Sequence, residues 1–242
     1  YMKKLILIVL LLVGGVASGQ SVTGTSGLIH IPSARMLEDG QLVIGAAFIP
    51  KGIYHRTYGP NKFDVRLNPG LNTYITYGFL PFLEIMFRYS HELNIPVSFE
   101  TEYFPDRMFS ARLRVINETK NLPSIVFGIH DLAQYIGVVS GVPNFSTNYV
   151  VGSKLFSISD KLNIDLDIGY AFDISKFKTV AYNGLFGGVE IYHNSFGQFS
   201  LNAEYDSNKF IFGGKINLFS KINLMLGLWD LNKPTFAFNY LF

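Results

Sequence analysis

The feature that most constrains this chain is a two-residue alternation of apolar and polar side chains, sustained over segments of about ten residues. In residues 162–173 one face reads Leu, Ile, Leu, Ile, Tyr, Phe, and the other reads Asn, Asp, Asp, Gly, Ala, Asp. Residues 83–90, 199–206 and 222–229 alternate in the same way. Successive side chains of a strand point to opposite faces, and helical spacing does not sort these residues, so the pattern predicts long β-strands.

Turn or loop residues separate the alternating segments from one another. We expect strands at about 41–49, 70–79, 82–90, 108–117, 124–131, 147–156, 162–173, 184–193, 198–206, 209–219, 222–229 and 234–242. Many of these segments have the length of about 9–11 residues that a tilted strand needs to cross a bilayer. Their number is even, as in single-chain bacterial barrels. The predicted fold class is therefore all-β, a transmembrane antiparallel β-barrel of about 12 strands.

The links between the expected strands alternate in length over most of the chain. The long links are at about 50–69, 91–107, 132–146 and 174–183, and the links between them are short. Bacterial barrels have long loops on the outside and short turns on the periplasmic side, so both termini are expected in the periplasm. A soluble β-sandwich is the alternative, but its strands are usually shorter and its links are not expected to alternate.

The composition agrees with a sheet whose outer face meets lipid. Charged residues make up 16% of the chain, below the roughly 25% of soluble domains, while aromatic residues reach 15%. No apolar run after the first 20 residues is long enough for a transmembrane helix. A closed barrel is then the only form that pairs every backbone polar group within lipid. We expect the chain in the bacterial outer membrane of a Gram-negative cell, with membrane lipid as its partner.

The N-terminus has the pattern of a cleavable signal peptide. Lys3 and Lys4 precede a nine-residue apolar run, and the small residues Ala17, Ser18 and Gly19 precede polar Gln20. A membrane-anchoring helix would need about 20 apolar residues. We therefore divide the chain into a signal peptide (1–19), a periplasmic leader or plug-like segment (20–39) and the barrel (40–242). The other end agrees, because an aromatic residue, Phe242, closes the last alternating strand.

In a barrel the polar face of each strand points into the lumen, so its charges indicate what lines the interior. The expected lumen-lining residues are Glu84, Arg88, Arg112, Arg114, Asp165, Asp167, Glu190 and Glu204. The basic members lie on the third and fourth strands, and most acidic members lie four or five strands away. Two arrangements stay open: the walls face each other across a water-filled channel, or they meet as salt bridges that close it.

Three stretches resemble the YjbH family of outer-membrane proteins linked to exopolysaccharide production. The first spans residues 24–45 and contains the motif residues Gly27, Leu28, Pro32, Ala34 and Arg35. The second spans residues 77–89, and the third spans residues 106–154 and includes Asp131. The order and spacing match over residues 24–172. The chain departs from the family pattern in being shorter, in having no cysteine, and in carrying His130 where the family usually has Arg.

The resemblance implies a porin-like barrel that is a channel or an accessory component of exopolysaccharide export. Its partners would be the polysaccharide and other export proteins. A closed scaffold barrel that recruits partners through residues 24–38 is the alternative, and an outer-membrane enzyme acting on lipid or glycan is a third. For residues 24–38 themselves, a plug or docking element and a strap against the barrel floor both remain open.

The motifs of other functional classes are missing from the sequence. The five histidines do not pair at metal-ligand spacing, and the sequence has no HExxH, GxSxG, P-loop or GxGxxG motif. The absence of cysteine excludes disulfides and a lipid-modified cysteine. Without Lys3 and Lys4, the 20 basic residues fall to 18 and equal the 18 acidic ones, so no basic surface for nucleic acid is expected. We expect no enzyme activity, no metal and no cofactor.

Overall fold

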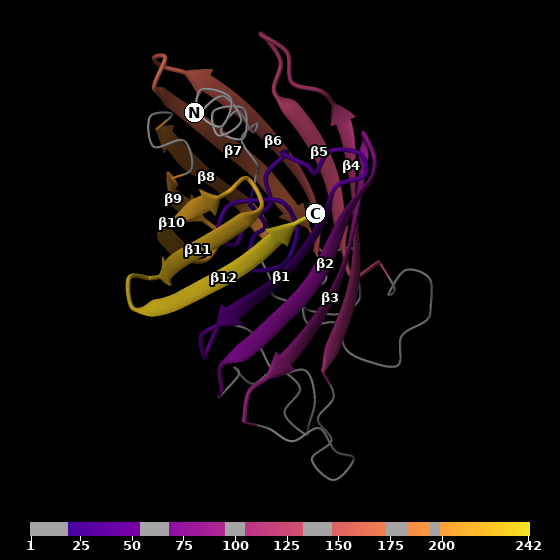
Figure 1. Ribbon diagram of the computed structural model, residues 1–242, viewed down its shortest axis with the longest axis vertical. Coiled ribbons are helices and arrows are strands. Elements are labelled where there is room, and N and C mark those ends of the chain that lie inside the picture. Colours follow the sequence, from indigo (N-terminus) through magenta and orange to yellow (C-terminus); the bar gives the residue numbers. More distant parts are fainter. Residues whose placement is uncertain (1–18, 54–67, 95–104, 133–146, 173–182, 194–198) are drawn as a thin grey trace, which may run out of the picture.

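The chain forms a closed barrel of twelve antiparallel strands, as Figure 1 shows. The computed structural model describes residues 19–53, 68–94, 105–132, 147–172, 183–193 and 199–242. The strands are β1 (Leu42–Ile49), β2 (Gly70–Leu80), β3 (Leu83–Glu92), β4 (Asp106–Ile116), β5 (Ser124–His130), β6 (Thr147–Ser157), β7 (Leu162–Phe172), β8 (Gly184–His193), β9 (Phe199–Tyr205), β10 (Phe210–Leu218), β11 (Ile222–Trp229) and β12 (Lys233–Leu241). Their ends differ from the predicted ends by at most two residues, so the predicted fold class is confirmed. Except for Gly19, the predicted signal peptide lies outside the described residues.

The sheet has no open edge, because the first strand pairs with the last. β1 and β12 are antiparallel, with a register from Val43↔Leu241 to Phe48↔Phe236. Every other strand pairs with its neighbours in the sequence. Closure satisfies the backbone N–H and C=O groups of the strands within the sheet, which is the condition for crossing a bilayer with β-structure. Within the described ranges no helix is long and apolar enough to span a membrane.

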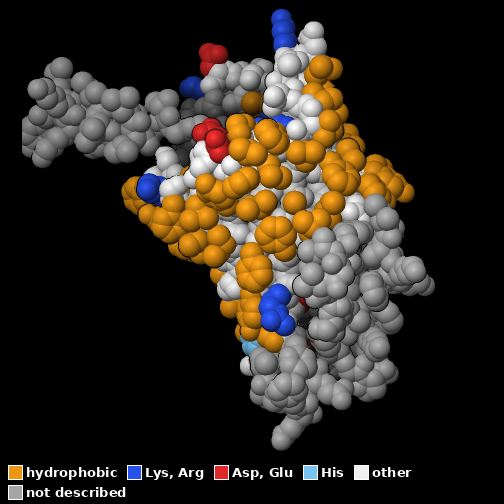
Figure 2. All heavy atoms as spheres, turned by 90° about the vertical axis from the view of Figure 1, so that its right-hand side faces the viewer, with side chains coloured by type: hydrophobic (Ala, Val, Ile, Leu, Met, Phe, Trp, Pro, Cys, Tyr) orange, Lys and Arg blue, Asp and Glu red, His pale blue; other side chains and the backbone are white. Residues whose placement is uncertain are grey.

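The outer face of the barrel is apolar and the inner face is polar, as the alternation predicts. On β7 the side chains of Leu166, Ile168 and Tyr170 are 40–57% exposed, whereas those of Asp165 and Asp167 are at most 2% exposed. Figure 2 shows one side of the barrel, where apolar side chains cover the wall and charged side chains appear toward its ends. An apolar belt of this extent on a closed sheet faces lipid, so the chain is a membrane-spanning barrel.

The two ends of the barrel differ in their connections. At the terminal end, where β1 begins and β12 finishes, β2 meets β3 and β10 meets β11 through short turns. In the second of these turns Phe219 and Ser220 both have positive φ, 55° and 56°, the backbone form of a tight hairpin. The opposite end is the loop end, where most of the connecting residues lie outside the described ranges.

Residues 19–38, which we call the inner segment, lie inside the barrel. Every residue from 20 to 34 is buried, and isolated bridges join Gln20 to Ser26 and Gly27 to Pro32. The segment enters from the terminal end, reaches the loop half of the lumen and returns to join β1. In Figure 1 it is the indigo trace between the walls of the barrel.

The core of the protein forms where the inner segment meets the barrel wall. Val22 and Ile29 belong to one apolar cluster that includes Trp229, and Leu28 and Ile31 belong to a second that includes Tyr149 and other wall residues. Small wall residues make room for these side chains. A Cβ added to Gly188 would lie 2.6 Å from Cδ2 of Leu28 and 2.9 Å from Cβ of Glu204, so glycine is required for the close approach.

Candidate functional site

The eight residues expected to line the lumen all lie on strand positions that point inward. Seven of them are at most 5% exposed, and Arg114 is half-buried at the terminal end. They are not buried against each other across the barrel. The inner segment lies between the walls, and most of these side chains bond to it. We therefore take the interface between the inner segment and the wall as the candidate functional site.

Glu84 on β3 joins the middle of the inner segment to the part that leads back to β1. Its carboxylate accepts hydrogen bonds from Ser26 Oγ at 2.7 Å and from the Leu37 N–H at 3.0 Å. It also accepts a hydrogen bond from Arg112 Nη1 of the neighbouring strand β4 at 2.8 Å. Arg112 in turn donates to the carbonyl oxygens of Ser33 and Arg35. This buried pair replaces the backbone partners that the inner segment lacks outside a sheet.

A second pair of charged side chains binds the middle of the inner segment from the other wall. Glu204 on β9 accepts hydrogen bonds from the consecutive N–H groups of Ile29, at 3.0 Å, and His30, at 2.7 Å. Lys215 on β10 donates to the Gly27 carbonyl at 2.6 Å and lies 3.5 Å from Glu190. An acidic and a basic group therefore satisfy adjacent N–H and C=O groups of the same stretch of chain.

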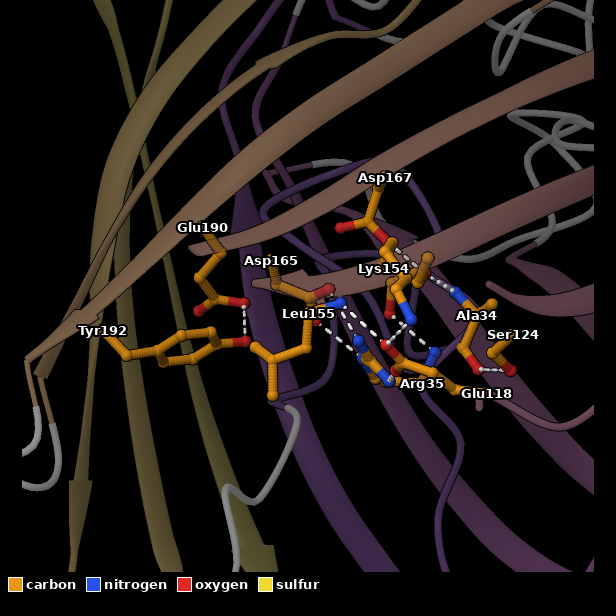
Figure 3. Close-up of polar contacts among 12 residues, drawn as sticks. Ala34, Arg35, Glu118, Ser124, Lys154, Leu155, Asp165, Asp167, Glu190 and Tyr192 are labelled. Atoms are coloured by element: carbon orange, nitrogen blue, oxygen red, sulfur yellow. Dashed lines mark hydrogen bonds and ion pairs between the residues drawn. The ribbon is translucent and has the colours of Figure 1, made fainter. Parts of the chain in front are cut away.

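Residues 33–38, which lead from the lumen back to β1, are called the return arm. Arg35 binds this arm to the wall, as Figure 3 shows. Its Nε and Nη2 donate to the two carboxylate oxygens of Asp165 on β7 at 2.6 and 2.7 Å, a two-bond contact, and its Nη1 donates to Glu118. Burial alone would lower the pKa of Arg35, but its bonds to Asp165 and Glu118 raise that pKa above the ordinary value. Glu118, in the β4–β5 turn, is held by the same contact. Burial acts to raise its pKa, whereas the hydrogen bond from Arg35 lowers it overall.

His30 anchors the part of the inner segment that lies nearest the loop end of the barrel. Its Nδ1 lies 2.9 Å from Oδ2 of Asp206, and its ring centroid lies 4.6 Å from that of Trp229. Burial acts to raise the pKa of Asp206, but the hydrogen bond with His30 brings it below the ordinary value. Nearby, Arg88 donates to the Thr23 carbonyl at 3.2 Å.

The remaining family-like residues fix the path of the inner segment. Gly27 and Pro32 form a bridge so tight that a Cβ on Gly27 would lie 2.3 Å from the Ile31 carbonyl oxygen. The Ala34 N–H donates to Ser153 Oγ at 2.5 Å, and that hydroxyl bonds to Asp167. Leu28 packs in the second apolar cluster. Asp131 lies apart from these residues, at the end of β5, buried and with a positive φ of 59°.

The lumen charges match neither of the two arrangements that the sequence left open. The walls are not separated by a polar channel at the level of the inner segment, and in the described residues the acidic β7–β9 groups do not pair directly with the arginines of β3 and β4. The inner segment, through its backbone and Arg35, bonds to charged side chains of both walls. Residues 24–38 lie between the walls of the barrel, which is the place of a plug rather than of a strap against the barrel floor.

Several residues of the site were missing from the sequence-based set: Ser26, Glu118, Lys215 and Asp206. Lys215 stands on the polar face of an alternating strand, and this signal was sufficient to include it. Asp206 ends the predicted alternating strand 198–206 on its polar face, so the same signal applied to it. Ser26 and Glu118 lie outside the strands, where period 2 gives no facing. Among the described residues, no group of three or more His, Asp or Glu side chains has an arrangement suited to a metal ion.

Comparison with known proteins identifies related chains. The model of the YjbH family, described as "Exopolysaccharide biosynthesis protein YbjH", matches residues 19–173. The "Uncharacterized lipoprotein YjbH" of Escherichia coli (strain K12) is 25% identical over 239 residues, covering 86% of this chain and 31% of that protein. The chain thus spans about a third of the length of that curated relative.

Solved outer-membrane proteins have a similar arrangement of strands. The KdgM porin in complex with disordered oligogalacturonate is similar with a TM-score of 0.49 and 9% identity, covering 84% of this chain and 98% of the porin. A bacterial polysaccharide outer membrane secretin gives a TM-score of 0.35 and 12% identity, covering 85% and 99%. At such identities these likenesses do not indicate a shared function.

Proposed function

Because the chain belongs to the YjbH family of exopolysaccharide biosynthesis proteins, we propose that it is an accessory outer-membrane barrel of exopolysaccharide export, closed at rest by its own inner segment. The chain is a porin-like outer-membrane barrel in architecture. Its proposed role differs from that of an open porin, because polymer does not pass through the lumen while residues 20–34 occupy it.

The observation that carries this proposal is the way the buried wall charges are satisfied. Glu84, Glu204 and Lys215 are each at most 3% exposed, and each bonds to a backbone or hydroxyl group of the inner segment. A buried charge that loses its partner is strongly unfavourable. The inner segment is therefore an integral part of the folded barrel, which suits a closed accessory component.

Conductance tests the closed state directly. We expect the mature barrel, inserted into a planar lipid bilayer, to show no steady conductance at moderate voltage. Steady conductance of the unmodified protein would overturn the closed barrel. The pathway assignment is tested separately: deleting the gene should reduce secreted polysaccharide, and the unmodified gene should restore it. An unchanged amount of polymer would overturn the accessory role.

A channel that opens when the inner segment moves is the second candidate, and the geometry of the return arm favours it. Arg35 holds this arm through ion pairs at the terminal end, where its side chain and that of Glu118 are 24% and 22% exposed. Contacts that reach water are weaker than buried ones and are more easily released. Brief conductance events that appear in Arg35→Gln and not in the unmodified barrel would support this channel.

We propose no catalytic role for the chain. Among the described residues, Ser110 Oγ lies 3.0 Å from His130 Nδ1, a contact between a hydroxyl group and an imidazole. Both side chains are 1% exposed within the wall. A nucleophile must reach its substrate as well as its base, so this pair lacks the access that catalysis requires. Hydrolysis of a lipid or glycan that is lost in Ser110→Ala would contradict this proposal.

A further inference from the structure

A cavity of about 570 Å³ lies at the terminal end of the barrel, next to the return arm of the inner segment. We call it the vestibule. It is lined by residues at both ends of the inner segment, by the terminal ends of β1, β4, β10, β11 and β12, and by neighbouring turns. Its volume falls within the range of about 300–1,000 Å³ that is typical of small-molecule sites. Its lining includes Arg35 and Glu118, which are bound to each other at the return arm.

One wall of the vestibule is a row of hydrogen-bonded amides. Asn239 donates to Asn223 at 3.0 Å, and Asn223 donates to Asn217 at 2.7 Å. Gln20 lies at the same cavity, 1% exposed, and its Oε1 has no hydrogen-bond partner among the described residues. A side-chain amide offers two N–H donors and an oxygen acceptor, so this wall presents both kinds of group to a ligand. A buried amide oxygen without a partner indicates that a polar group belongs there.

The other wall carries Arg114, for which no ion pair with a carboxylate is found among the described residues. Arg114, near the end of β4, donates to the Pro81 carbonyl at 3.2 Å, and its buried Nε has no partner among the described residues. The two neighbouring arginines differ from it: Arg112 is paired with Glu84, and Arg35 binds Asp165. The guanidinium of Arg114 therefore remains available for an anion, and its planar group of donors suits a carboxylate.

We infer that the vestibule binds an acidic sugar unit, with the carboxylate on Arg114 and the hydroxyl groups on the amides of Gln20, Asn217 and Asn223. A sugar hydroxyl both donates and accepts a hydrogen bond, which matches an amide, and one unpaired guanidinium matches one carboxylate. Apolar side chains in the lining, including Val43 and Leu241, can pack against the C–H groups of a sugar ring. The choice of a saccharide over another hydroxylated acid rests on the proposed role in exopolysaccharide export.

Calorimetric titration of the whole folded barrel in detergent micelles tests this site. The probes are cellobiouronic acid and cellobiose, two disaccharides that differ by a carboxylate. We expect the acidic disaccharide to bind about tenfold more tightly than the neutral one. Arg114→Gln should remove this preference by weakening only the acidic ligand. Arg107→Gln is the matched control, because Arg107 lies exposed at the other end of β4 and should not alter binding.

Three results would overturn the inference: no binding of the acidic disaccharide, equal binding of both disaccharides to the unmodified barrel, or an undiminished preference in Arg114→Gln. Inorganic phosphate that binds as tightly as the acidic disaccharide would reduce the site to a general anion site and would also overturn it. Heat-modifiable mobility on gels verifies that each variant is folded. If Arg114→Gln does not fold, Asn217→Leu, which removes an amide assigned to the hydroxyl groups, should weaken both disaccharides, and unchanged binding of both would overturn the site. Failure to bind the disaccharide would overturn the vestibule site but not the proposal of a closed barrel. Conductance of the unmodified barrel would overturn the closed barrel but not the vestibule site.

Discussion

The barrel wall and the inner segment are stabilised in opposite ways. In the wall each strand has two antiparallel neighbours, and backbone hydrogen bonds define its place. The inner segment belongs to no sheet: it has two isolated bridges and a few backbone hydrogen bonds within itself. The charged side chains of Glu84, Glu204, Arg112 and Lys215 supply further partners to its backbone.

The difference shows what an inward charge does in this barrel. On the outer face a charge would meet lipid, and in an open lumen it would meet water. Here the wall charges meet a polypeptide and act as its hydrogen-bond partners. We therefore expect substitutions in the two regions to lower stability for different reasons. Inside the barrel a buried charge loses its partner, and on the outer face a new charge is poorly solvated.

The largest expected effect follows from removing one member of the buried pair that clamps the inner segment. Arg112→Gln leaves the Glu84 carboxylate, which is 0% exposed, without its cation. We expect the free energy of unfolding to fall by about 3–5 kcal/mol, as for other buried pairs that lose one partner. Urea unfolding in detergent micelles measures this loss. Arg107→Gln, on the same strand but exposed, is the control, and an equal loss in both variants would contradict the clamp.

A somewhat smaller effect is expected on the outer face. Leu166 lies midway along β7 and its side chain is 40% exposed on the lipid side. Leu166→Arg should destabilise the barrel by about 2–4 kcal/mol, because a charge near the bilayer midplane is poorly solvated. The loss should appear when the variant unfolds from lipid vesicles. Leu231→Arg, in the turn between β11 and β12, should have little effect, and a similar loss there would place the membrane belt elsewhere.

A third substitution tests the contact between the two regions. Gly188→Ala places a methyl group 2.6 Å from Cδ2 of Leu28 and 3.1 Å from the Ala203 carbonyl oxygen. We expect a loss of about 1–3 kcal/mol from overpacking. Gly152→Ala is the control, because the nearest atom to its Cβ is 3.8 Å away. If urea titration gives both variants the same stability, the inner segment does not pack tightly against β8.

The sequence was sufficient to predict the wall and insufficient to predict what fills it. The strand Leu162–Phe172 alternates without interruption, so its facing follows from the backbone geometry of a single strand. The same rule gives inward positions to Asp165 and Asp167. The contacts Ser26–Glu84 and Arg35–Asp165 join residues 58 and 130 positions apart, and period 2 carries no information about them.

The inner segment also explains why the lumen was difficult to interpret from charge alone. The sequence shows opposite charges on distant strands, which indicates either a water-filled lumen between two charged walls or salt bridges between them. Neither arrangement includes a segment of chain inside the lumen. Arg35 was singled out only as part of a family-like motif, without a partner. Its two-bond contact with Asp165 requires the chain to turn back inside the barrel, and no local pattern in residues 24–38 predicts that path.

The smallest expected effect is a pH dependence of stability at the contact between His30 of the inner segment and Asp206. Hydrogen bonding with His30 holds the pKa of Asp206 below its ordinary value of 3.8, despite burial that acts to raise it. A carboxyl group whose pKa is lower in the folded state stabilises the fold fully above the unfolded pKa. That contribution is lost as the pH falls through the folded pKa, so the loss of stability occurs below about pH 4.

Asp206→Asn should reduce stability at pH 6 and lose less additional stability than the unmodified barrel on acidification. Asp39→Asn, which removes an exposed carboxylate, is the control for the change in net charge. Urea unfolding at pH 6 and pH 3 measures the difference, and parallel losses in the unmodified barrel and Asp206→Asn would show that this carboxylate does not anchor the inner segment.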